Sequence, residues 1–136
     1  MTNAGHPPLL WCRASRDEWS WLETQRASER ERPAGVPLGL FADVTYDRLV
    51  VKPKSDDLMV LYSDGVSEAT SPAGKEFGRD GLMKMASALD TNSAEALDTN
   101  SAEALGTQLA SALRAFRGDR DPLDDETIIV MRRNAL

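Results

Sequence analysis

The sequence contains one cysteine, one histidine and no long apolar run. A single cysteine, Cys12, excludes an internal disulfide, and with His6 as the only imidazole a zinc site would have too few ligands. No stretch of about 18 apolar residues and no signal peptide is present, so neither a membrane span nor export is expected. These features predict a protein of the cytoplasm.

Basic residues are also fewer than acidic residues. The chain has 16 Lys and Arg against 22 Asp and Glu, a net charge of −6, and its basic residues are scattered apart from a small group in residues 26–32. Such a chain repels nucleic acid and anionic membranes, so neither is an expected partner. With 136 residues, 41% hydrophobic and 28% charged, the composition is that of one globular domain, residues 1–136.

Three segments carry β-strand patterns. Residues 44–51 (VTYDRLVV) and 58–63 (LMVLYS) are rich in β-branched, aromatic and apolar side chains, and the polar break 52–57 (KPKSDD) between them predicts a hairpin or meander. The unbroken apolar run 58–62 predicts a central strand covered on both faces. A third strand is predicted over 127–131. Trp19 and Trp21, two residues apart, suit one face of a strand rather than a ligand cage.

Two segments have helical periodicity. Residues 78–89 place Leu82, Met85 and Leu89 on one face, and residues 105–116 do the same with Leu105, Leu109, Leu113 and Phe116. Between them the octapeptide ALDTNSAE occurs twice, over 88–103. Eight residues at ~100° each rotate an apolar face by ~80°, so both copies cannot serve one core and one is surplus. Each copy contains an Asn-x-x-Glu pattern, in which the Asn can cap a helix and the Glu can reach back to it. The second helix therefore has two possible starts. A binding array is the alternative, although two copies are few for a repeat protein.

Acidic residues stand at the ends of two predicted strands. Asp64 follows the strand at 58–62, and Asp124 and Asp125 precede the strand at 127–131. If these strands are antiparallel neighbours, the acids meet at one end of the sheet. Oxygen-only ligands favour Mg²⁺ or Mn²⁺, and such ions support phosphoryl-transfer chemistry. The alternative is that Asp-Gly marks a hairpin turn and that the other acids are solvated turn residues.

Four motifs, taken together and in order, carry a family resemblance: NAGHPP (3–8), PLGLF (37–41), LYSDGVSEATSPAGKEFGRDGL (61–82) and DDETIIVMRR (124–133). They resemble the C-terminal half of PPM-type metal-dependent serine/threonine phosphatases, in particular the bacterial SpoIIE-like branch. The resemblance implies an α+β fold, part of an α-β-β-α sandwich with mainly antiparallel sheets flanked by helices. It implies that Asp64, next to Gly65, and Asp124 bind Mn²⁺ or Mg²⁺, with Asp125 a less certain neighbour.

The activity implied by this resemblance is hydrolysis of phosphoserine or phosphothreonine by metal-activated water. The implied substrate is a phosphorylated regulatory protein of signal transduction, such as an anti-anti-sigma factor. However, the family's upstream Asp-x-x-Gly element, whose aspartate bridges two metals, has no counterpart here; Asp80 with Gly81 falls at a later helix start. We therefore expect the isolated chain to be an incomplete enzyme. The alternative is a non-catalytic remnant that binds a phosphoprotein or partner, and self-association or pairing with a missing N-terminal half both stay open.

Two further residues, His6 and Glu68, have two interpretations each. His6 could act as general acid, since an imidazole can give and take protons near neutral pH, but a turn residue whose ring contacts backbone groups is favoured. Glu68 could support the ligands from behind, but a solvated position at a helix start is favoured. Cys12, beside Trp11, is interpreted as a buried apolar residue.

Overall fold

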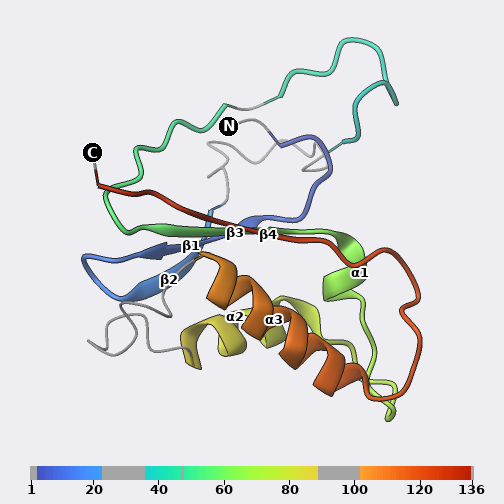
Figure 1. Ribbon diagram of the computed structural model, residues 1–136. Coiled ribbons are helices and arrows are strands. Elements are labelled where there is room, and N and C mark those ends of the chain that lie inside the picture. Colours follow the sequence, from blue (N-terminus) through green and yellow to red (C-terminus); the bar gives the residue numbers. More distant parts are fainter. Residues whose placement is uncertain (1–2, 23–35, 47, 89–101, 136) are drawn as a thin grey trace.

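The computed structural model describes residues 3–22, 36–46, 48–88 and 102–135. In this part of the chain a four-stranded antiparallel sheet has the order β2-β1-β3-β4. Figure 1 shows helices α2 and α3 together on one face of the sheet and the short helix α1 at one end. The strands are β1 (Leu9–Arg13), β2 (Glu18–Leu22), β3 (Leu58–Tyr62) and β4 (Ile128–Arg132).

Strand β3 lies between β1 and β4, which confirms the predicted central strand. Its side chains alternate, as a strand requires: Leu58, Val60 and Tyr62 are buried, whereas Met59 and Leu61 are half-buried on the other face. On that second face, the register places Met131 and Ile129 of β4 opposite them, and both are exposed. The prediction that β3 is covered on both faces is therefore only half right for the described residues.

The helical predictions are confirmed. Helices α2 (Gly78–Ala88) and α3 (Ala102–Arg117) turn their apolar faces to the sheet. They bury Leu82 and Ala86 from α2 and Leu105, Leu109 and Leu113 from α3. Leu89 and most of the duplicated octapeptide, residues 89–101, lie outside the described residues, and the described helix begins within the second copy.

The side chains of β1 and β2 complete the core from the other edge. Trp19 and Trp21 are half-buried and both pack against the core, as predicted for one face of a strand. Trp21 meets Tyr62 edge-on with ring centroids 6.1 Å apart, a favourable aromatic geometry. Cys12 is buried in the same core, which confirms its interpretation as an apolar packing residue.

The predicted strand at 44–51 is wrong. In the described residues of this segment no strand forms, and Val50 is exposed. In Figure 1 the described residues 36–46 and 48–54 run on the side of the sheet opposite the helices. A β-branched sequence becomes a strand only where a neighbouring strand accepts its backbone hydrogen bonds, and here the two sides of β3 are already taken by β1 and β4. Local propensity alone could not supply that partner.

A buried carboxylate fixes the start of β3. Asp57, in the segment predicted as a polar break, has only 2% of its surface exposed. Its carboxylate accepts hydrogen bonds from Trp11 Nε1 at 3.2 Å, Ala14 N at 3.1 Å and Lys54 N at 2.9 Å. Because these donors satisfy the buried acid, Asp57 joins the 52–57 turn to β1 at the end of the sheet opposite Asp64.

Candidate metal centre

The pairing of β3 with β4 brings the predicted acids to one end of the sheet. The two strands are antiparallel, with Tyr62 opposite Ile128, and the pairing continues as Ser63 N donates to Thr127 O at 3.0 Å. Asp64 therefore follows β3 at the place where Asp124 and Asp125 lead into β4. The condition that the sequence left open, that these strands be antiparallel neighbours, is met.

Asp64 opens the one-turn helix α1 (Asp64–Ser67). Its backbone carbonyl accepts hydrogen bonds from Glu68 N at 2.8 Å and Ser67 Oγ at 3.1 Å. Its side chain is exposed, and one carboxylate oxygen, Oδ1, accepts from Gly65 N at 3.1 Å. The backbone of Asp64 is thus held in the turn while its carboxylate faces solvent, as a metal ligand requires.

Gly65 allows the two segments to approach closely. A Cβ placed on Gly65 would lie 2.6 Å from the carbonyl oxygen of Asp125 and 3.2 Å from the carbonyl carbon of Asp124. Both are backbone atoms, which cannot turn away as a side chain can. The glycine of the Ser-Asp-Gly motif is therefore needed because its missing side chain leaves room for the segment that carries Asp124.

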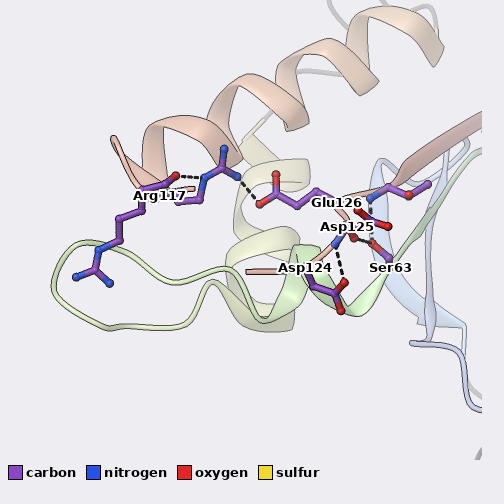
Figure 2. Close-up of polar contacts among 7 residues, drawn as sticks. Ser63, Arg117, Asp124, Asp125 and Glu126 are labelled. Atoms are coloured by element: carbon purple, nitrogen blue, oxygen red, sulfur yellow. Dashed lines mark hydrogen bonds and ion pairs between the residues drawn. The ribbon is translucent and has the colours of Figure 1, made fainter. Parts of the chain in front are cut away.

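Ser63 joins the same two segments by hydrogen bonds. Its hydroxyl donates to Asp125 O at 2.7 Å and accepts from Thr127 N at 2.9 Å, as Figure 2 shows. One side chain thus holds the backbone on both sides of Glu126. No prediction from the sequence covers this role of Ser63, although a hydroxyl residue directly before an acid at a strand end is a visible signal for it.

The three consecutive acids of the DDET motif have three different environments. Asp124 is exposed, and its Oδ1 accepts from the Asp125 amide at 2.7 Å. Asp125 contributes its carbonyl to Ser63, while its side chain is exposed. Glu126 is half-buried, and its carboxylate forms an ion pair with Arg117 at the end of α3 (Figure 2). Arg117 was not a candidate in the sequence, because nothing local marks a residue nine positions before its partner.

The donor set suits a hard divalent cation. Asp64 and Asp124 offer carboxylate oxygens, and Mg²⁺ is commonly bound through one or two carboxylates together with water and substrate phosphate. Within the described residues, however, no three His, Cys, Asp or Glu side chains lie close enough together to hold a metal ion. The described residues therefore fit part of a metal site and fall short of a complete protein cage.

His6 lies in the turn before β1. Asn3 Oδ1 accepts from His6 N at 2.9 Å, Asn3 Nδ2 donates to His6 O at 2.7 Å, and Gly5 has a φ of 89°. The ring nitrogen Nδ1 lies 2.8 Å from the carbonyl oxygen of Pro7. Because a carbonyl oxygen only accepts, this contact is a hydrogen bond in the tautomer whose Nδ1 is the donor. Glu68, the other residue with two readings, is exposed at the C-terminal end of α1.

The antiparallel sheet, with helices on one face and carboxylates where β3 ends and the edge strand β4 begins, matches part of the solved phosphatase domains of the PP2C type, also called PPM type. The solved phosphatase domain of the cell fate determinant SpoIIE from Bacillus subtilis superposes with a TM-score of 0.65 at 16% identity, over 96% of this chain and 48% of that chain. The SiaA-PP2C domain of Pseudomonas aeruginosa gives 0.62 at 18% identity, over 96% and 44%. The RsbU and RsbW domains of Rv1364c from Mycobacterium tuberculosis give 0.59 at 20%, over 98% and 32%.

Residues 1–134 match the family described as Stage II sporulation protein E (SpoIIE), and the chain belongs to this family of PPM-type phosphatase domains. Protein IcfG of Synechocystis is 28% identical over 86 residues, 63% of this chain and 12% of that protein. The predicted family and α+β fold are thus confirmed, and the chain spans less than half the length of each of these relatives. In the described ranges, no helix is both long and apolar enough to cross a bilayer.

Proposed function

We propose that this chain takes part in the metal-dependent hydrolysis of phosphoserine or phosphothreonine on a regulatory phosphoprotein. The observation that carries the proposal is the β3–β4 pairing, which brings Asp64 and Asp124 to one end of the sheet. Membership of the SpoIIE family supports the reaction class. The phosphorylated substrate, an anti-anti-sigma-like regulator of signal transduction in the cytoplasm, is proposed from the motif resemblance.

In this proposal Asp64 and Asp124 hold Mn²⁺ or Mg²⁺. When bound, such an ion lowers the pKa of a coordinated water and offsets the charge of the phosphoryl oxygens. The chain's own residues supply the frame: Ser63 bonds to the carbonyl oxygen of Asp125, and Gly65 leaves room for the two ligand-bearing segments to approach closely. Clustered carboxylates repel one another, so a divalent cation stabilises the arrangement that the backbone already imposes. Asp125 adds negative charge at the rim of the site.

A second candidate function is supported by the shortage of ligands. Because no three His, Cys, Asp or Glu side chains of the described residues form a group that could hold a metal ion, the chain could bind a phosphoprotein or a partner without turning it over. Two tight Mn²⁺ sites per chain, measured by calorimetric titration, would refute this non-catalytic reading.

The sheet face opposite the helices is partly uncovered and offers a contact surface. Ile129 and Met131 are exposed by 51% and 39% on the face opposite the helices, and exposed apolar strand faces mark contact surfaces. Since the chain covers only 48% and 44% of the solved SpoIIE and SiaA phosphatase domains, we propose that the remaining portion of such a domain packs on this face; a second copy of the chain is the alternative. Light scattering at high concentration separates the two, because only self-association raises the mass of the pure chain.

The decisive test is hydrolysis of p-nitrophenyl phosphate with and without Mn²⁺, comparing wild type with Asp64→Asn and Asp124→Asn. Asp121→Asn is the control, because Asp121 is an exposed acid of the segment that also carries Asp124. If the chain assembles a working site, both ligand variants lose the Mn²⁺-dependent turnover and the control keeps it. Turnover that survives in Asp64→Asn would refute the assignment. A folded wild-type chain without turnover would favour the non-catalytic reading.

A further inference from the structure

We infer that Arg117 and Glu126 are positioning residues that hold the Asp124 segment in shape from the side of α3. This inference rests on the metal site of the proposed function. Asp124 lies in residues 118–127, which join the end of α3 to β4, and residues 119–125 are all exposed. A segment so exposed gains little order from packing, so its shape depends on the polar contacts at its two ends.

Arg117 makes two of these contacts with one guanidinium group. Its Nε donates to the carbonyl oxygen of Arg120 at 2.7 Å, and its Nη1 is ion-paired with Glu126 Oε1 (Figure 2). The two charged side chains are only 13% and 17% exposed, so water screens the pair weakly. The planar fork of an arginine can bind both partners at fixed angles, and a lysine could not.

The segment is also tied to the turn after α1. Arg120 Nη2 donates to the carbonyl oxygen of Pro72 at 3.0 Å, and a Cβ placed on Gly118 would lie 3.2 Å from Pro72 Cγ. Gly118 ends α3 with a φ of 67° and donates to Arg114 O at 2.9 Å, which is a helix C-cap. The start of the segment 118–127 is therefore held by the C-cap of α3 and by its contacts with Pro72.

Ser63 and Arg117 together hold the segment on both sides of the proposed ligand. Before Asp124, Arg117 Nε binds the carbonyl oxygen of Arg120. After Asp124, Ser63 binds the backbone of Asp125 and Thr127, and Arg117 binds the side chain of Glu126. Asp124 lies exposed between Arg120 and these later contacts. The carboxylate of Glu126 is therefore paired with Arg117. This third acid of the DDET motif acts by fixing the backbone next to Asp124.

The test uses ¹⁵N-labelled wild type and Glu126→Gln, which keeps the size of the side chain and removes its charge. Amide hydrogen exchange of Thr127, measured without metal, reports the order of the segment. Broadening of the Asp64 and Asp124 amide signals by Mn²⁺ reports metal binding on the same samples. Asp56→Asn is the matched control, since it removes the charge of an acid paired with Arg132 at the other end of the sheet.

We expect Glu126→Gln to speed exchange of the Thr127 amide at least about tenfold and to weaken Mn²⁺ binding about 10–100-fold, the usual effect of losing a group that orients a ligand. Arg117→Lys should keep Thr127 exchange and Mn²⁺ binding closer to the wild-type values than Arg117→Met does, because lysine keeps the positive charge. The Asp56→Asn control should leave both measurements within about twofold of wild type.

The outcomes separate this inference from the proposed function. Unchanged Thr127 exchange in Glu126→Gln, or an equal effect of Asp56→Asn, overturns the positioning role and leaves the metal site standing. A wild-type chain whose Asp64 and Asp124 signals are not broadened by Mn²⁺ refutes the metal site, and with it the role of the pair in metal binding.

Discussion

Replacing Gly65 with alanine should separate the two segments that meet at the candidate metal centre. The new Cβ would lie 2.6 Å from Asp125 O, whereas ordinary contacts begin near 3.4 Å, so the backbone must give by about 0.8 Å. Overpacking against backbone costs about 1–3 kcal/mol, and the better helix propensity of alanine returns at most about 1 kcal/mol. We expect a net loss of about 1–2 kcal/mol and a Tm lower by roughly 4–10 °C.

Circular dichroism during thermal unfolding measures this effect, and Gly106→Ala is the control. Gly106 lies inside α3, where a Cβ would meet Val130 Cγ2 at 3.6 Å, an ordinary contact. That variant should keep or raise the Tm, because alanine is the better helix former by about 1 kcal/mol. A Gly65→Ala protein as stable as Gly106→Ala would refute the close approach of α1 to the Asp124 segment as a constraint on the site.

Two further predictions concern polar groups that the sequence did not mark. Asp57→Asn turns an NH2 group, which is a donor, toward at least one of the three N–H donors around this buried side chain, and we expect a loss of about 1–3 kcal/mol in urea unfolding. Asp56→Asn, which breaks an exposed ion pair, should cost less than about 1 kcal/mol, and equal losses would contradict the role given to Asp57. Ser63→Ala removes two hydrogen bonds, so it should cost about 1–2 kcal/mol and speed Thr127 amide exchange, while Ser63→Thr keeps the hydroxyl. An alanine variant as protected as the threonine variant would show that the hydroxyl does not hold the segment.

Periodicity was a good guide wherever a residue's own neighbours decide its state. The spacing of Leu105, Leu109 and Leu113 predicts the buried face of α3, and the apolar run at 58–62 predicts β3. The same reasoning failed at 44–51, whose β-branched residues form no strand, because strand formation depends on a pairing partner that propensity does not encode. It also missed Asp57, which reads as a turn residue and is buried by contacts from β1, 46 residues away.

The candidate site likewise depends partly on local sequence and partly on contacts between distant residues. The sequence by itself determined the chemistry on offer: carboxylates at two strand ends, a glycine beside one of them and too few imidazoles or thiols for zinc. Residue type and position along the chain are enough for that inference. Only the tertiary structure decided that the two strand ends meet, that Ser63 bridges them, and that Glu126 is bound to Arg117 while Asp124 stays exposed. Those outcomes depend on strand pairing and helix packing between residues up to 64 positions apart, and no local pattern records such distances.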